Sequence, residues 1–230
     1  MLIGGSAGIL LLDAVLTASG QVLLHAASLR MPQREAAVAI LAPSGVGKTT
    51  TALALAAQGF ALMTDDATVL ARVGEGSGAG LSAWGLPRPL KVHRRTAELL
   101  PEIGGVLGDV WNAEGEQSVA RTALQSAVEV LPPRPVSLAA LIVLGRRVSG
   151  QHRLRRVRKA DLLALLAADN IFGSRRGVLE PELARFHSLA RAATAMPALE
   201  LNVGGELATL ARCVLSTLDP VDYATPAPST

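Results

Sequence analysis

Apolar runs of four to seven residues, each bounded by turn residues, recur along the chain and predict buried strands. They cover residues 36–41, 60–63 and 138–144. A further short strand is expected at 198–203, between two helices. Weaker strand patterns lie at 68–72 and 152–158. In residues 152–158, apolar positions alternate with arginines, as on an exposed strand. Helix-forming stretches lie at 49–58, 94–100, 161–168, 180–194 and 206–218. Strands mixed with helices predict an α/β fold.

The N-terminal part of the chain predicts a β-hairpin. Residues 9–16 are apolar with little helical periodicity, residues 17–20 form a turn, and residues 21–29 provide a second strand. Further along, Gly59 closes the helix at 49–58. We expect Asp161 to cap the helix at 161–168, because a short acidic side chain can accept from the first backbone N–H groups.

Two stretches predict irregular structure. Residues 74–80 alternate glycine with small or charged residues and predict a flexible loop. Residues 102–137 are rich in glycine, proline and polar residues, and predict loops around weak strands. We expect a single domain over 1–224, followed by a flexible Pro/Ser tail at 225–230.

Composition narrows the class of protein. Half of the 230 residues are apolar but only 3% are aromatic, so the core has to consist mainly of Ala, Leu and Val. Cys213 is the only cysteine, which excludes an internal disulfide and fits a reducing compartment. Asp13, His25 and Arg30 interrupt the first apolar stretch, which is then too short to cross a bilayer. The sequence predicts a cytoplasmic, globular protein with no membrane partner.

The charge balance does not favour a nucleic-acid partner. The formal net charge is only +3, from 22 basic and 19 acidic residues. The densest basic run is 153–159, with no aromatic side chains beside it on which bases could stack. We interpret this run as a solvated strand face.

A phosphate-binding loop is the strongest chemical signal. Residues 42–49 read Ala-Pro-Ser-Gly-Val-Gly-Lys-Thr, between a buried strand and a helix, which is the context of a P-loop. Gly45 and Gly47 allow backbone N–H groups to surround phosphate oxygens. Lys48 would reach the β- and γ-phosphates, and the Thr49 hydroxyl can ligate Mg²⁺.

One position departs from the P-loop pattern, because Ala42 stands where the pattern has glycine. Alanine costs little there if its φ is negative, and roughly 1 kcal/mol or more if a positive φ is required. The residues predicted to bind the nucleotide, which we take to be ATP with Mg²⁺, are Ser44, Gly45, Val46, Gly47, Lys48, Thr49 and Thr50.

Two adjacent carboxylates follow the P-loop helix. The apolar strand at 60–63 leads into Thr64, Asp65 and Asp66, as in a Walker B strand that positions an acid beside the metal. A pair allows one carboxylate to hold Mg²⁺ while the other accepts a hydroxyl proton. Both can face the phosphates only if the strand ends there and the backbone turns. We expect that turn, with Asp65 as the base and Asp66 as a metal ligand together with Thr49.

These residues resemble the catalytic domain of the HPr kinase/phosphorylase family, which is similar in fold to phosphoenolpyruvate carboxykinase. The matching elements are Leu24-His25, the loop at 42–49 and the Gly-x-x-Leu-x-x-Asp-Asp pattern at 59–66. The resemblance is specific over residues 21–72. It implies a mixed sheet with a P-loop and flanking helices, and a catalytic role for His25 in which it orients one of the aspartates or tunes its pKa. Without the resemblance, a core histidine on an apolar strand explains His25 equally well.

Outside that stretch the resemblance is weaker. The family's Glu-Ile-Arg-Gly stretch is absent, and residues 84–93, with Arg88 and Lys91, occupy its place. Residues 170–173, Asn-Ile-Phe-Gly, are a counterpart of a later Asn-Leu-Phe-Gly element. Arg175 and Arg176 could position a phosphate, or could equally be solvated.

The resemblance implies transfer of the γ-phosphoryl group of ATP to a serine-type hydroxyl of a peptide or protein. Short relatives resemble kinases of ribosomally made peptides, including lasso peptides, so a precursor peptide is a reasonable acceptor. The alternative is a nucleotide-binding regulator or small assembly ATPase without a hydroxyl acceptor. Homo-oligomerisation is left open by the sequence.

Overall fold

A computed structural model describes residues 6–74, 80–171 and 180–218. Four features named from the sequence therefore lie wholly or partly outside the described residues. They are the loop at 74–80, Phe172-Gly173, Arg175-Arg176 and the tail at 225–230.

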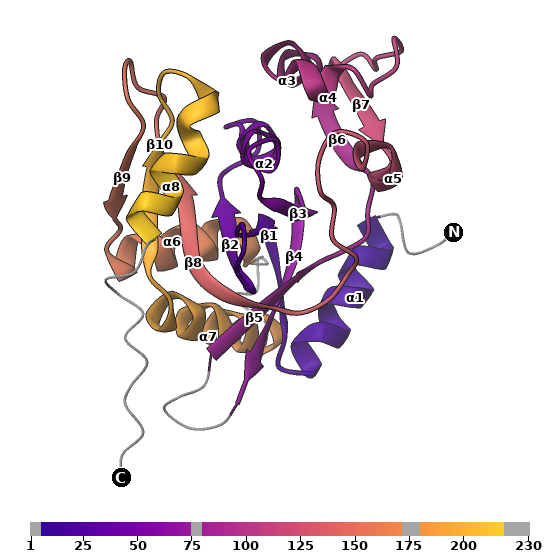
Figure 1. Cartoon of the computed structure of the whole chain (residues 1–230). Helices are drawn as coiled ribbons and strands as arrows, with labels where there is room; N and C mark the ends of the chain where they lie inside the picture. The colour runs from indigo at the N-terminus through magenta and orange to yellow at the C-terminus, as the bar shows by residue number, and fades with distance from the viewer. Residues whose placement is uncertain (1–5, 75–79, 172–179, 219–230) are drawn as a thin grey trace.

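The centre of the molecule is a mixed β-sheet (Figure 1). Its strands are β1 (Val22–Arg30), β2 (Ala36–Leu41), β3 (Ala61–Thr64), β4 (Ala67–Val73), β5 (Gly80–Gly85), β8 (Val136–Leu144), β9 (Arg153–Arg156) and β10 (Ala198–Asn202). Strand β8 runs parallel to β2 and β10, and the other pairings are antiparallel. A second, two-stranded sheet pairs β6 (Leu90–His93) with β7 (Glu116–Val119).

Helices flank the central sheet, and three short ones lie beside β6 and β7 (Figure 1). They are α1 (Ser6–Ala18), α2 (Lys48–Ala56), α3 (Arg94–Leu99), α4 (Pro101–Gly104), α5 (Arg121–Leu124), α6 (Lys159–Asn170), α7 (Glu180–Ala195) and α8 (Leu210–Leu218), with a 3₁₀ turn at Leu207–Thr209. Figure 1 shows α2 and α8 on one side of the central sheet, α6 and α7 on the other, and the short helices α3, α4 and α5 beside β6 and β7. The predicted α/β class, with a mixed sheet and flanking helices, is confirmed.

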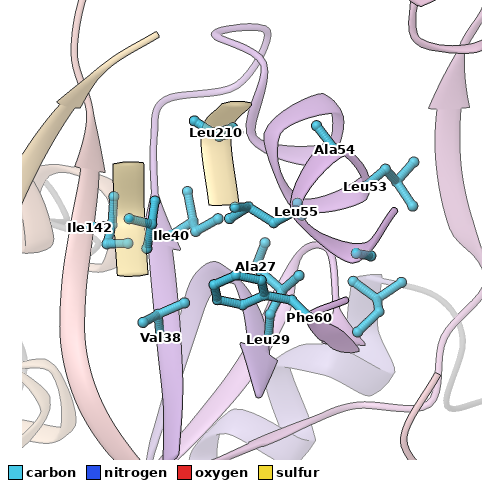
Figure 2. Packing of buried hydrophobic residues seen from close by; sticks show 14 of the residues in the cluster. Ala27, Leu29, Val38, Ile40, Leu53, Ala54, Leu55, Phe60, Ile142 and Leu210 are labelled. Atoms are coloured by element: carbon cyan, nitrogen blue, oxygen red, sulfur yellow. The ribbon is translucent and has the colours of Figure 1, made fainter. Parts of the chain in front are cut away.

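Alternation along the strands explains the two helical layers. In β2, Val38 and Ile40 belong to the cluster that includes residues of α2 and α8, whereas Ala39 and Leu41 belong to the cluster that includes residues of α6 and α7. Successive side chains of a strand point to opposite faces, so both faces of β2 are buried. Figure 2 shows Phe60 in the first cluster, among aliphatic side chains of α2 and the strands.

The pairings also close a circuit of strands. Strand β1 pairs with β2 and β4, β2 with β8, β8 with β5, and β5 with β4. Strand β3 pairs with the second half of β1. The P-loop strand β2 and the acidic strand β3 therefore lie on opposite sides of β1, which brings the two motifs together.

The N-terminal β-hairpin prediction is wrong, because residues 9–16 lie within helix α1. Short apolar runs cannot be assigned to strand or helix by periodicity alone, and Leu and Ala favour helices. Tertiary contacts fix the outcome: Asp13 of α1 is buried and forms an ion pair with Arg185 of α7, which also donates to the Leu23 carbonyl at 2.9 Å. Leu16, also in α1, packs against Leu23 of β1.

Two smaller corrections concern helix ends. The N-cap of α6 is Arg158 rather than Asp161, whose carboxylate instead accepts from the Arg158 guanidinium at 2.8 and 2.9 Å. The predicted helix at 206–218 is divided into the 3₁₀ turn and α8. Among the described residues, no helix has the length and apolar content needed to span a membrane.

Candidate active site

The P-loop connects the buried strand β2 to helix α2, as predicted. Gly45 and Gly47 have φ of +79° and +109°, backbone angles that residues with a Cβ rarely adopt. No atom lies within 4 Å of a Cβ built on either glycine, so the loop faces open space. Ala42 is fully buried without a positive φ, so alanine fits the first P-loop position.

The N-terminus of α2 suits an anion. Its N-cap is Gly47, and no side chain caps the first turn, so the first backbone N–H groups have no side-chain acceptor. Unsatisfied N–H groups and the positive end of the helix dipole form the usual phosphate site at a helix N-terminus. The residues present therefore fit the phosphates of a nucleotide.

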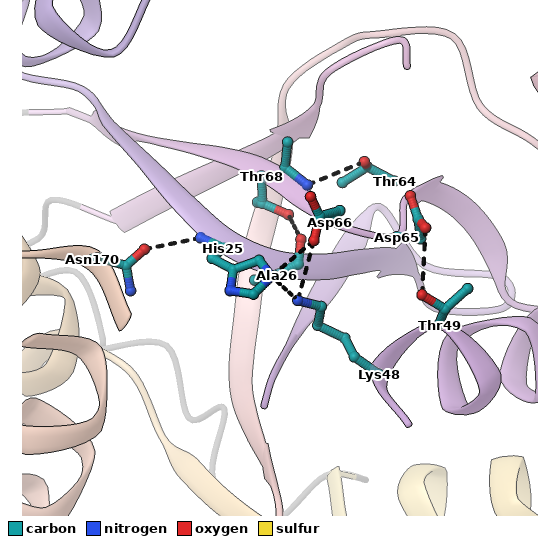
Figure 3. Close-up of polar contacts among 10 residues, drawn as sticks. His25, Ala26, Lys48, Thr49, Thr64, Asp65, Asp66, Thr68 and Asn170 are labelled. Carbon is teal, nitrogen blue, oxygen red and sulfur yellow. Dashed lines mark hydrogen bonds and ion pairs between the residues drawn. The ribbon is translucent and has the colours of Figure 1, made fainter. Parts of the chain in front are cut away.

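The two aspartates lie in a turn, because β3 ends at Thr64 and β4 begins at Ala67. Both carboxylates consequently contact the start of α2 (Figure 3). Asp65 Oδ2 accepts from Thr49 Oγ1 at 3.4 Å, and Asp66 Oδ1 accepts from Lys48 Nζ at 3.3 Å. The turn expected from the sequence is confirmed.

His25 lies between Asp66 and Lys48 and contacts both. Its Nε2 lies 2.8 Å from Asp66 Oδ1 and 2.5 Å from Lys48 Nζ (Figure 3). A neutral imidazole nitrogen either donates or accepts, so Nε2 cannot satisfy both neighbours at once. The backbone carbonyl of Asp66 also accepts from Ala26, which fixes the aspartate beside β1.

Burial separates the two carboxylates. Asp65 is 5% exposed, and its desolvation, helped by the charge of Asp66, raises its pKa to about 6. The side chain of Asp66 is 50% exposed, and its pKa lies well below the usual range because His25 and Lys48 stabilise the carboxylate. Burial also lowers the pKa of Lys48, against the attraction of Asp66.

Two backbone contacts position these side chains from outside the motifs. Asn170, buried at the C-terminus of α6, accepts from the His25 backbone N–H at 2.9 Å. The backbone N–H of Lys91 donates to the Asp65 carboxylate. The structure thus brings Asn170 and the stretch at 84–93 to the site.

Sequence reasoning missed two residues that hold the aspartate turn. The Arg121 guanidinium donates to the carbonyls of Met63 at 2.7 Å and Leu131 at 2.5 Å, and its charge acts on Asp65. A Cβ on Gly85 of β5 would lie 2.2 Å from the Met63 carbonyl oxygen, so only glycine allows this approach. Arg121 lies in the irregular stretch at 102–137, where no local pattern marked it.

Other side chains named from the sequence contact neighbouring elements or face solvent. The Lys91 side chain is 75% exposed, with Nζ 4.0 Å from Glu116 Oε2, so only its backbone contacts the aspartates. Thr50 Oγ1 lies 2.7 Å from Thr96 Oγ1 of α3 and links the two helices. Ser44 and Val46 are exposed in the loop.

The donor set suits Mg²⁺ rather than a metal held by many protein ligands. Thr49 and Asp65 offer a hydroxyl and a carboxylate at the edge of the phosphate loop. Mg²⁺ is commonly bound by one or two such groups together with substrate phosphates and water. In the described part of the chain, no group of three or more His, Cys, Asp and Glu side chains forms a metal site of its own.

Comparisons with known proteins find similarity among solved structures and none in sequence. No protein-family model matches the chain, and no curated protein matches its sequence. One similar solved structure is an HPr(Ser) kinase/phosphatase from Coxiella burnetii, with 14% identity and a TM-score of 0.40 over 85% of this chain and 95% of that one. Similarity at this level does not establish a shared function, so the proposal below rests on the residues of the site.

Proposed function

We propose that this protein is an ATP-dependent kinase that transfers the γ-phosphoryl group to a serine-type hydroxyl of a peptide or protein. The observation that carries the proposal is the convergence of five side chains at the start of α2. They are His25, Lys48, Thr49, Asp65 and Asp66. The resemblance of residues 21–72 to the HPr kinase/phosphorylase family supports the same chemistry.

The loop and the buried half of the site would hold the nucleotide and its metal. Backbone N–H groups of residues 44–49 would bind phosphate oxygens, and Lys48 would contact the β- and γ-phosphates. Thr49 and Asp65 would ligate Mg²⁺, which neutralises phosphate charge when bound. Asp65 suits this role because it lies against the P-loop threonine and away from solvent.

Asp66 is then the better candidate for the base, the reverse of the division expected from the sequence. It is half exposed, so an acceptor hydroxyl can approach it, whereas Asp65 is buried. His25 lies within hydrogen-bond distance of Asp66 and can orient its carboxylate. In the transfer, the acceptor oxygen gives its proton to Asp66 and bonds to the γ-phosphorus, and the bond to the leaving ADP breaks.

The contact between Lys48 and His25 gives the nucleotide a second effect. Phosphates that draw the Lys48 ammonium away from Nε2 leave His25 able to donate to Asp66. Loss of the Lys48 charge also raises the pKa of Asp66, since that charge helps to lower it. The loss of the Lys48 charge makes Asp66 a more effective proton acceptor once the nucleotide is bound, and the hydrogen bond from His25 orients its carboxylate.

The acceptor we favour is a peptide, for example the precursor of a ribosomally made peptide of the lasso type. The test is mass spectrometry of a serine-containing peptide incubated with the protein, ATP and Mg²⁺, where a gain of one phosphate is expected. Lys48→Ala should abolish transfer. Lys91→Ala is the matched control, because its ammonium is exposed and away from the aspartates. Phosphate release without any transfer to an acceptor would instead favour an ATPase.

A further inference from the structure

A cavity of about 390 Å³ lies away from the aspartate pair, among residues of β9, β10, β8 and α6. Arg155, Arg156 and Arg158 line it, together with the apolar Val143 and Leu162. Its volume falls within the range of ligand sites, roughly 300–1,000 Å³. Strand β9 forms the outer end of the sheet (Figure 1). The exposed side chains of Arg155 and Arg158 place the opening of the cavity at the surface.

Arginine is the most frequent residue in the lining of the cavity, and two of these arginines form ion pairs within the lining. Arg155 Nε donates to Glu200 Oε2 at 2.5 Å, and Arg158 donates to both carboxylate oxygens of Asp161. These pairs orient the guanidinium groups of two arginines whose side chains are 72% and 84% exposed. The lining contains three arginines and two carboxylates, and Arg153 and Lys159 belong to the same basic stretch of the sequence.

Helix α6 connects this cavity to the proposed active site. At the N-terminal end of α6, Asp161 and Leu162 line the cavity. At the C-terminal end of the same helix, Asn170 accepts a hydrogen bond from the His25 backbone. The nine residues from Asp161 to Asn170 correspond to about 14 Å along a helix. An extended peptide covers that distance with about four to five residues.

We propose that the cavity binds an acidic stretch of the acceptor peptide, placed about four to six residues from the hydroxyl that Asp66 serves. The inference rests on the proposed function, because it assumes that a peptide reaches the aspartates. Carboxylates of the peptide would pair with the exposed arginine heads, which suit planar bidentate partners. None of the residues lining the cavity is aromatic, which disfavours a single-stranded nucleic acid as the occupant.

The test uses fluorescent synthetic peptides, each with one serine among uncharged residues. One carries two glutamates about five positions from the serine, one carries them next to the serine, and one carries glutamines instead. Binding is measured by fluorescence anisotropy without nucleotide, and transfer by mass spectrometry with Mg·ATP. The cavity variant is Arg156→Gln with Arg158→Gln. The control removes the same charge at the exposed Arg146 and Arg147, which do not line the cavity.

We expect the spaced glutamate peptide to bind about tenfold more tightly than the other two, and the cavity variant to lose that preference. The control should keep it, and thermal unfolding should show both variants folded. In the transfer assay, the cavity variant should raise KM for the spaced peptide and leave kcat unchanged.

Three results would overturn the inference: equal binding of the glutamate and glutamine peptides, equal loss in the control, or tighter cavity-dependent binding of a single-stranded oligonucleotide. Equal transfer to all peptides would overturn it while keeping the kinase. Cavity-dependent peptide binding with no transfer to any serine would support the acidic-peptide site and overturn the proposed function.

Discussion

The two halves of the candidate site are built from adjacent residues but in opposite surroundings. Thr49 and Asp65 form a buried half, in which desolvation raises the pKa of the carboxyl to about 6. His25 and Asp66 form a partly exposed half beside the buried Lys48, and hydrogen bonding from His25 and the charge of Lys48 lower the pKa of the Asp66 carboxyl. Environment rather than residue type therefore separates the two aspartates.

The difference also shows what each half depends on. The exposed half is held by Asn170 behind His25 and by the backbone of β1. The buried half is held by Arg121 and by the Lys91 backbone. Changes to each set should therefore produce different defects.

The largest effect is expected for Asp66→Asn. An amide cannot take the acceptor proton, so kcat should fall by about 10³-fold while the affinity for Mg·ATP is kept. Asp65→Asn should instead raise the Mg²⁺ concentration needed for half-maximal transfer. Asp109→Asn, at an exposed position, is the control. Exchange of the two phenotypes would restore Asp65 as the base, and normal transfer by both variants would exclude the proposed mechanism.

The next effect is the pH dependence of stability in the metal-free protein. The Asp65 pKa is raised, so its ionisation costs stability as the pH increases from about 4 to 6, and the cost persists above that range. Asp65→Asn should therefore be more stable than the parent at pH 8, by up to about 3 kcal/mol, and equally stable near pH 3.

Asp66 should behave in the opposite way in the same unfolding experiments. Its lowered pKa contributes stability above the unfolded pKa, and this contribution is lost as the pH falls. Asp66→Asn should therefore destabilise the protein at pH 8 and matter less in acid. The same sign for both variants would show that the two environments do not differ as described.

A smaller effect is expected for Arg121→Met, which leaves the Met63 and Leu131 carbonyls without their donor. The free energy of unfolding should fall by about 2 kcal/mol, the cost of buried polar groups without partners. The Mg²⁺ requirement should rise severalfold, because Asp65 follows Met63 by two residues. Arg121→Lys should recover part of both losses. The control Arg95→Met, at an exposed position, should cause neither loss. A defect confined to kcat would place Arg121 in the other half.

The smallest effect is expected for Asn170→Ala, which removes the acceptor of the His25 backbone N–H. Stability should fall by about 1 kcal/mol and kcat by a few-fold, with KM for ATP unchanged. Asn112→Ala is a matched control, since Asn112 Oδ1 also accepts a backbone N–H, that of Glu116, at 2.7 Å. If both variants lose kcat equally, the effect of Asn170 is one of general stability.

The parts of the site that the sequence predicted correctly are local. The strand, loop and helix around Lys48 and the turn at Asp65 lie within residues 36–72, where glycines and the end of an apolar run act on neighbouring residues. His25 was named only through a family resemblance. Arg121 could not be found in this way, because its contact with Met63 joins residues 58 positions apart in an irregular stretch.

The fold shows the same limit. Strand β2 was predicted correctly because a short apolar run bounded by polar residues suits a strand buried on both faces. The same kind of run at 9–16 became helix α1, because the ion pair between Asp13 and Arg185 and the packing of Leu16 on β1 depend on distant segments. The assignment of roles within the aspartate pair likewise required the contacts to Thr49 and His25.

The glycine at position 85 has a consequence for anyone who maps this protein by random mutagenesis. Every substitution there places a carbon on the Met63 carbonyl, from which the aspartate turn begins two residues later. In a screen for lost activity, Gly85 should therefore rank with Lys48, although it has no side chain to offer a substrate. Testing the inactive variants for folded protein would separate positions needed for the fold from residues that take part in the reaction. It would also show how far the intolerant region extends beyond the groups that react.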